Sequence, residues 1–145
     1  MPFFEPIGVI RTPYLDEVPR QPDESAQGEF RIILDERFRE GLDQLGIFRY
    51  IYVLFHLDRL DRTIRMTVTP PTAKGRQVGL FASRSPARPN PIGLSIVRIL
   101  KIEGTTIYIS GIDARDETPL LDIKPYIRDL DSKPDANLGW RDDEQ

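Results

Sequence analysis

Cysteine is absent from this 145-residue sequence, and histidine occurs once, as His56. Without thiols the protein has no disulfide, no thiolate zinc site and no cysteine nucleophile, and a cytoplasmic location is the expectation. One histidine excludes most histidine-rich metal sites, so we predict no bound metal. His56 ends the apolar run FRYIYVLFH (48–56), where a packed histidine or one at a strand edge is expected.

Long apolar runs and glycine-rich loops are missing as well. No run approaches the length of a membrane span, and the start, MPFFEPIGVIR, lacks the features of a signal peptide, so we expect no membrane association. The ten glycines form no G-x-G, and the sequence has neither a Walker phosphate loop nor a G-x-S-x-G elbow. An enzyme with this sequence would therefore use an uncommon scaffold.

Short apolar runs rich in Ile, Val, Tyr and Phe recur between turn-forming residues, and each has the length of a β-strand. They occupy residues 6–11, 28–34, 48–56, 63–69, 77–82, 94–102 and 106–112. Many strands without βαβ alternation predict an all-β sandwich or barrel, and the length predicts a single domain.

One short helix is predicted between the second and third of these runs. Asp35 is placed to cap it, and Gly46 is placed to end it. Apolar residues follow at helical spacing between these two ends, namely Phe38, Leu42 and Leu45.

Charge is distributed unevenly along the chain, whose net charge is −3. Residues 59–101 contain nine Lys/Arg and one acidic residue, whereas the rest contains 11 bases and 22 acids. Two interpretations are open: a local site for a polyanion, or outward arginines balanced in space by acids from elsewhere. The last residues, 129–145, form a polar, mostly acidic tail that Trp140 either anchors or leaves loose.

The stretch FASRSPARPNPIGLS (81–95) is both stiff and positive. Each of its prolines fixes its own φ and moves the preceding residue out of the helical region. They are Pro86, Pro89 and Pro91. We therefore expect an extended loop of low conformational entropy that holds polar side chains ready for a ligand. These side chains are Arg84, Arg88 and Asn90. The alternative is a rigid structural corner with solvated arginines.

A cluster of acidic residues follows the last predicted strand, in SGIDARDETPLLDIKPY (110–126). Asp113 comes directly after the apolar run, where a carboxylate suits a ribose diol or an amino group. Asp116 and Glu117 are interpreted as turn formers. Whether Asp122 and Lys124 pair with each other or contact a ligand is open.

The motifs of the chain, taken together and in order, resemble the TsaA-like family, also called TrmO or YaeB. They are RTPY (11–14), VPRQPD (18–23), GLFASRSPARPNPIGLS (79–95) and DETPLLDIKPY (116–126). Members carry a run like GVFATRSPxRPNPIGLS followed by DGTPVLDIKPY. The resemblance extends over most of the chain, and the long proline-rich run is highly specific.

The resemblance implies an S-adenosylmethionine-dependent tRNA methyltransferase. Its expected product carries a methyl group on N6 of the threonylcarbamoyl-modified adenosine at position 37, beside the anticodon. The implied fold is mainly β, a single-sheeted β-barrel with one or two short helices, unlike Rossmann-type methyltransferases. We expect this domain in residues 1–128, the tail in 129–145, and a homodimer that binds tRNA through the basic segment 59–101.

Carried over by motif, the family's cofactor contacts fall in four segments. They are Gln21, Pro22 and Asp23; Asp58 and Arg59; Arg84 and Leu94; and Ser110, Gly111, Ile112 and Asp113. Two positions depart from the family pattern. Asp58 and Arg59 stand where bacterial relatives commonly have a His-Gln pair, and Glu117 replaces the glycine of the DGTP turn, where positive φ is harder for it.

Catalysis of methyl transfer depends mainly on positioning, with an acceptor for the N6 proton as an additional aid. Asn90 and Arg88 are the candidate catalytic residues, by analogy with Asn/Asp-Pro-Pro motifs in other adenine-N6 methyltransferases. Arg84 would hold the cofactor's carboxylate or a phosphate, and Asp113 its adenosine part. The alternative function is a non-catalytic β-barrel that binds RNA or a small ligand with the same loops.

Overall fold

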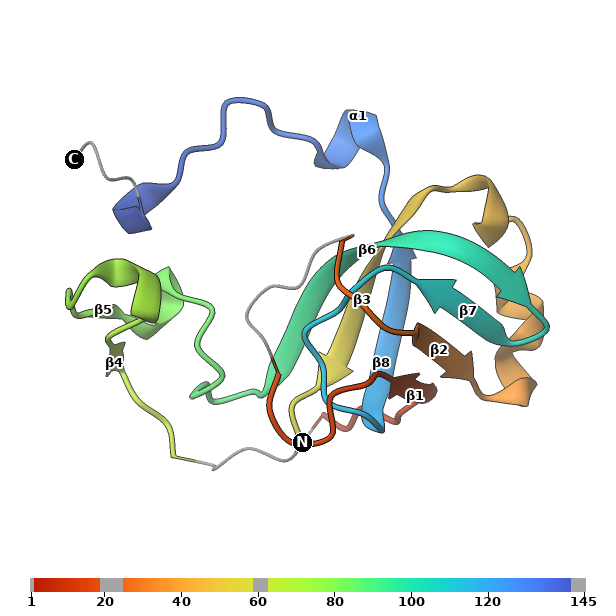
Figure 1. Ribbon diagram of the computed structural model, residues 1–145, viewed down its shortest axis with the longest axis horizontal. Coiled ribbons are helices and arrows are strands. Elements are labelled where there is room, and N and C mark those ends of the chain that lie inside the picture. Colours follow the sequence, from red (N-terminus) through yellow and green to blue (C-terminus); the bar gives the residue numbers. More distant parts are fainter. Residues whose placement is uncertain (1, 19–24, 59–62, 142–145) are drawn as a thin grey trace.

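A computed structural model gives the structure of residues 2–18, 25–58 and 63–141. Six antiparallel strands form one sheet that closes on itself in the order β1-β2-β7-β6-β3-β8, with β8 paired back to β1 (Figure 1). They are β1 (Gly8–Arg11), β2 (Phe30–Leu34), β3 (Tyr50–His56), β6 (Ile92–Glu103), β7 (Thr106–Ile109) and β8 (Thr118–Pro125). The predicted mainly β class is confirmed.

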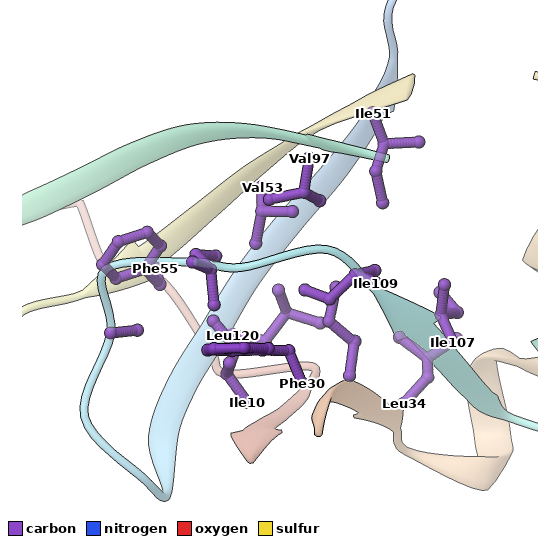
Figure 2. Packing of buried hydrophobic residues seen from close by; sticks show 13 residues of the cluster. Ile10, Phe30, Leu34, Ile51, Val53, Phe55, Val97, Ile107, Ile109 and Leu120 are labelled. Carbon is purple, nitrogen blue, oxygen red and sulfur yellow. The ribbon is translucent and has the colours of Figure 1, made fainter. Parts of the chain in front are cut away.

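The hydrophobic core fills the inside of the closed sheet, because side chains alternate between the two faces of each strand. On β3, Ile51, Val53 and Phe55 are buried, and the residues between them are half-buried. Figure 2 shows these side chains packed with Ile10 of β1 and Leu120 of β8. Every second side chain of β3 is therefore buried, as expected for a strand that turns one face toward the core.

The glycine of the PNPIGLS run has a packing reason. Gly93 of β6 pairs with Phe55 of β3, and a Cβ at this position would overlap the Phe55 ring. Because Phe55 is almost fully buried, the ring has no free space into which it could move. Only glycine lets β6 lie this close to the core at residue 93.

Residues Thr118–Pro125 form the strand β8, whereas the sequence predicts an acidic cluster and no strand there. The strand lies between β1 and β3, and its pairing with both closes the sheet. Pro119 and Pro125 interrupt the apolar pattern, but both lie near the ends of β8, where a proline is best tolerated. Asp122 and Lys124 pair with each other on the surface, with 3.3 Å between carboxylate and ammonium.

The predicted helix forms as two 3-10 helices, η1 (Glu36–Leu42) and η2 (Leu45–Ile47). Asp35 caps η1 as predicted, since its carboxylate accepts a hydrogen bond from the Arg37 N–H at 3.4 Å. The predicted end at Gly46 is wrong, because this glycine lies inside η2. Short 3-10 turns suit a segment in which Gly41 weakens the α-helix.

Residues 63–91 form a small lobe beside the closed sheet, called the basic lobe below (Figure 1). It contains β4 (Thr67–Val68), η3 (Pro71–Ala73), β5 (Val78–Gly79) and η4 (Leu80–Ala82). The strands predicted at 63–69 and 77–82 are thus wrong in length, since each is only two residues long. A hairpin with no third strand and with prolines at its turn cannot extend further.

α1 (Arg128–Asp131) leads into the tail, which reaches the basic lobe at η5 (Gly139–Arg141) (Figure 1). The indole N–H of Trp140 donates a hydrogen bond to the Ala82 carbonyl, so Trp140 anchors the described part of the tail. Within residues 2–18, 25–58 and 63–141, no helix has the length and apolar character needed to cross a bilayer.

Candidate functional site

The proline-rich stretch is an ordered loop that runs from the end of η4 into β6. Its two serines form turns: the Ser83 hydroxyl accepts from the Ser85 N–H at 3.3 Å, and the Ser85 hydroxyl accepts from the Ala87 N–H at 3.3 Å. The Ser83 hydroxyl also donates to the Leu80 carbonyl at 2.8 Å. The serine turns add to the prolines, from which the sequence predicts a fixed loop.

Arg88 binds backbone carbonyls of its own loop and of η4. Its Nη1 donates to the backbone carbonyls of Ser83 at 2.9 Å and Ser85 at 3.1 Å, with a weaker contact to that of Leu80 at 3.4 Å. The guanidinium also lies over the Phe81 ring, with its carbon 5.7 Å from the ring centroid. Arg88 therefore organises the loop, while Arg84 and Asn90, the other predicted polar side chains, are exposed.

The far end of the loop is joined to the end of β3. The Pro91 carbonyl accepts a hydrogen bond from the Leu57 N–H at 2.8 Å, and the next residue, Asp58, turns back on the His56 carbonyl at 2.9 Å. His56 is half-buried at the end of β3, as predicted. The structure therefore brings the predicted Asp58 segment to the proline-rich loop.

Asp113 lies in the segment that follows β7, and it contacts β6. Its Oδ1 accepts a hydrogen bond from the Ser95 hydroxyl at 2.6 Å, and the residue is half-buried. A carboxylate has two oxygens, so Asp113 keeps capacity to accept hydrogen bonds from a diol or an amino group. Ser95 is the last residue of the proline-rich motif but was not among the predicted site residues, because its contact with Asp113 joins positions 18 residues apart and depends on the fold.

The segment before Asp113 is buried and fixed. Ser110, Gly111 and Ile112 are all buried, and the Ser110 hydroxyl accepts a hydrogen bond from the Arg98 N–H at 2.9 Å. This buried segment leads directly into Asp113, and direct cofactor contacts by these residues stay a prediction.

Leu94 points away from this cluster. The side chain of Leu94 is 56% exposed, whereas the next residue, Ser95, is half-buried and reaches Asp113. Since successive side chains point to opposite faces of a strand, the Leu94 side chain and Asp113 lie on different faces of β6. The remaining predicted cofactor residues, Gln21, Pro22, Asp23 and Arg59, lie outside the described residues.

Two of the sequence motifs, RTPY and DETP, meet at an ion pair. Arg11 Nε donates to Asp116 Oδ1 at 2.7 Å, and the same oxygen accepts from the Thr12 N–H at 3.0 Å. The Arg11 hydrogen bond holds the pKa of Asp116 below its usual value. The Thr12 hydroxyl donates to the Ala114 carbonyl at 2.8 Å, so this cluster fixes the loop that follows Asp113.

The turn after Asp116 has the backbone shape that the family glycine suggests. Glu117 has a φ of +68°, in the left-handed region that L-residues seldom adopt. Its N–H donates to the Ile10 carbonyl at 2.9 Å, and Thr118 closes the turn onto the Arg115 carbonyl. The interpretation of Asp116 and Glu117 as turn residues is confirmed, and Glu117 bears a conformational cost.

The outer face of β6 carries a row of exposed apolar side chains, called the β6 ridge below. They are Ile92, Leu94, Ile96 and Leu100, with exposed fractions of 41%, 56%, 52% and 62%. Metal-ligating groups do not gather in the described part of the chain, where no three Asp, Glu or His side chains are suitably close.

The closed β-sheet and the ordered loop define a β-sheet domain whose candidate site is built on loops, without a glycine-rich nucleotide loop. Residues 9–132 match the tRNA-methyltransferase O N-terminal domain family. The chain belongs to this family, as its proline-rich motif suggests.

Several relatives align with nearly the whole chain. A probable S-adenosyl-L-methionine-binding protein of Pyrococcus abyssi is 35% identical over 94% of this chain and 74% of its own length. The tRNA (adenine(37)-N6)-methyltransferase of Escherichia coli is 37% identical over 94% of this chain and 63% of its own. A relative from Archaeoglobus fulgidus is 39% identical over 92% of this chain, which spans only 36% of that protein.

Solved structures of the family agree with the fold. A crystal structure of TrmO superposes with a TM-score of 0.79 at 34% identity, over 96% of this chain and 64% of that one. The Pseudomonas aeruginosa TrmO structure gives 0.78 at 32% identity, over 96% of this chain and 62% of its own.

Proposed function

We propose that this protein is an S-adenosylmethionine-dependent methyltransferase that methylates N6 of adenine 37 in tRNA, on the threonylcarbamoyl-modified nucleoside. Family membership and the names of the relatives support the reaction class. We assign the activity to residues 1–128, as a β-barrel enzyme, and treat 129–145 as a tail. A cytoplasmic location follows from the tRNA substrate.

One observation carries the proposal: three separately predicted segments meet along residues 91–95. Pro91 binds the Leu57 N–H beside Asp58, and Ser95 binds Asp113 at 2.6 Å. Residues 91–95 follow directly after the ordered loop that carries Arg84 and Asn90. A donor and an acceptor nucleoside held along this line would be positioned by rigid elements, which is the main requirement of methyl transfer.

The cofactor supplies a methyl group on a positively charged sulfur. Asp113 would accept hydrogen bonds from its hydroxyl or amino groups, with Ser95 fixing the carboxylate. Arg84, which is exposed at the loop, suits the cofactor's carboxylate. Gln21, Pro22, Asp23, Asp58, Arg59, Leu94 and the segment Ser110 to Ile112 complete the set that the family pattern indicates.

The acceptor nitrogen must lose a proton as its bond to carbon forms. With the cofactor bound, N6 of adenine would attack the methyl carbon, the carbon–sulfur bond electrons would stay on sulfur, and the N6 proton would pass to solvent water. We assign the Asn90 side-chain carbonyl to accept that proton's hydrogen bond, which localises the nitrogen lone pair. Arg88 acts as a positioning residue through the carbonyls of Ser83 and Ser85.

The surfaces of the chain suit the expected partners. The basic lobe would contact phosphates of tRNA, because residues 63–91 contain five Lys/Arg and no acid. The β6 ridge suits a homodimer contact through Ile92, Ile96 and Leu100, which are exposed on β6, while Leu94 is assigned to the cofactor.

The deciding experiment measures transfer of labelled methyl groups to tRNA with and without the threonylcarbamoyl group. We expect transfer to the modified tRNA, a rate about a hundredfold lower for Asn90→Ala at saturating cofactor, and no change for Asn137→Ala in the tail. Near-normal turnover by Asn90→Ala would refute the assigned acceptor. Cofactor and RNA binding without any transfer would instead favour a non-catalytic binding module.

A further inference from the structure

An aromatic side chain stands exposed on the basic lobe. Phe81, in η4, is 75% exposed, whereas the preceding residue Leu80 is 1% exposed. Aromatic side chains of folded proteins are usually well buried. Leu80 thus packs inside the lobe, whereas the ring of Phe81 is available to a partner.

The backbone on both sides of Phe81 is held in place. Before it, the Leu80 N–H donates to the Met66 carbonyl at 2.9 Å. After it, the Ala82 carbonyl accepts the Trp140 indole N–H at 2.6 Å. A ring on such an anchored turn loses little conformational entropy when a ligand binds.

A guanidinium lies over the same ring. Arg88 is 5.7 Å from the Phe81 centroid, and the Ser83 and Ser85 carbonyls fix its Nη1. Because most of the ring stays exposed, the pair presents an aromatic surface supported by a fixed cation. Proteins bind unpaired nucleobases on surfaces of this chemistry.

The surrounding charge favours a polyanion as the occupant. Besides Arg84, which is assigned to the cofactor, Arg65, Lys74 and Arg76 are exposed on the lobe, which has no acidic residue. Contact between the basic lobes of two copies would bring like charges together, which disfavours that alternative.

We propose that Phe81 is a stacking platform for one unpaired base of the tRNA anticodon loop, with Arg65, Lys74 and Arg76 of the basic lobe on the flanking phosphates. The proposal rests on the proposed function, which places N6 of adenine 37 of that loop at Asn90. Loop bases are accessible to stacking because they can leave their own stack.

The test uses the full chain and an anticodon stem-loop RNA in which 2-aminopurine replaces each loop base in turn. Stacking quenches its fluorescence, so we expect quenching at one loop position with the wild type and with Phe81→Trp. Phe81→Leu should lose the quenching and bind RNA about tenfold more weakly, the effect of one lost stack. Phe3→Leu removes another Phe that is 86% exposed and lies outside the lobe, and it should change neither quantity.

Salt dependence separates stacking from charge. Phe81→Leu should leave the slope of log affinity against log salt unchanged, whereas Arg76→Gln should reduce it by about one. A reduced slope in Phe81→Leu with unaltered quenching would overturn the stacking role.

Two further outcomes distinguish the proposals. Wild-type affinity and quenching in Phe81→Leu, with methyl transfer intact, would overturn the platform and leave the proposed function standing. A loss of dimer association in Phe81→Leu by sedimentation, with RNA affinity retained, would also overturn it. Quenching that depends on Phe81 without any methyl transfer by the wild type would support the platform and refute the proposed function.

Discussion

The indole N–H of Trp140 donates a hydrogen bond to the carbonyl oxygen of Ala82 at 2.6 Å, across 58 positions of sequence. This bond ties the C-terminal tail to the basic lobe, where η5 also packs against η3. The hairpin of the lobe has strands of only two residues, too short for independent stability. We infer that the tail stabilises the lobe and, through it, the start of the proline-rich loop.

Trp140→Phe should loosen the basic lobe while leaving the closed sheet unchanged. The substitution keeps an aromatic ring but removes the donor, and one hydrogen bond contributes about 1 kcal/mol. Amide hydrogens around residues 78–83 should then exchange about fivefold faster, as measured by mass spectrometry. Leu138→Ala is the matched tail variant, since Leu138 is 61% exposed, and it should leave exchange unaltered. Equal protection in both variants would mean that the bond does not stabilise the lobe.

Glu117→Gly should stabilise the protein. Glu117 has a φ of +68°, which costs an L-residue about 1–2 kcal/mol. Glycine removes that cost but raises the entropy of the unfolded chain, so the net gain should be about 0.5–1 kcal/mol. Urea denaturation followed by circular dichroism measures the change.

Glu40→Gly is the control for this substitution. Glu40 is exposed and lies within η1, where the backbone needs no positive φ. The same glycine should there destabilise the protein by about 0.5–1 kcal/mol. Destabilisation by Glu117→Gly as well would show that the Glu117 turn is not strained.

Asp116→Asn should destabilise the protein near neutral pH and much less in acid. The Arg11 hydrogen bond lowers the pKa of Asp116 in the folded state, so the ionised carboxylate stabilises the fold above the unfolded pKa of about 4. This stabilisation is lost as the pH falls through the folded pKa. Unfolding free energies of wild type and variant should differ by about 1–2 kcal/mol at neutral pH and converge toward pH 3.

Asp122→Asn is the matched control for the pH series. Asp122 pairs with Lys124 at 3.3 Å, and both side chains are well exposed. An exposed pair contributes less than about 1 kcal/mol, so the variant should follow the wild type closely at every pH. A constant difference for Asp116→Asn down to pH 3 would exclude the charge of Asp116 as the cause.

The sequence predicts those parts of the fold whose pattern repeats locally. The near-continuous run at 48–56 becomes β3, whose alternate residues fill the core, as strand spacing requires. The sequence does not indicate β8, because Pro119, Asp122 and Pro125 interrupt the apolar pattern around its two buried residues. The segment is a strand because it pairs with β1 and β3, which are distant in sequence. The lobe strands were overestimated because propensity alone does not reveal the lack of a third strand.

The site shows the same division between local and distant information. The prolines alone predict that the 84–91 loop is stiff. Glu117 stands where the family has glycine, and this substitution predicts the strained backbone found at Glu117. Neither spacing nor composition shows that Arg11 meets Asp116 across 105 positions, or that Ser95 meets Asp113. The sequence also does not show that Arg88 binds the carbonyls of its own loop, because a guanidinium can bind an external anion equally well.

Ser95→Ala and Asp113→Asn should weaken binding of S-adenosylmethionine in a coupled way. Asp113→Asn removes the acceptor charge and should lower affinity about tenfold or more. Ser95→Ala should lower it several-fold, because the carboxylate loses the hydroxyl that fixes it at 2.6 Å. The double variant should bind little more weakly than Asp113→Asn alone, since both changes break one contact. Isothermal titration measures all three, with Ser132→Ala in the tail as control. Additive losses would show that Ser95 acts on the cofactor independently of Asp113.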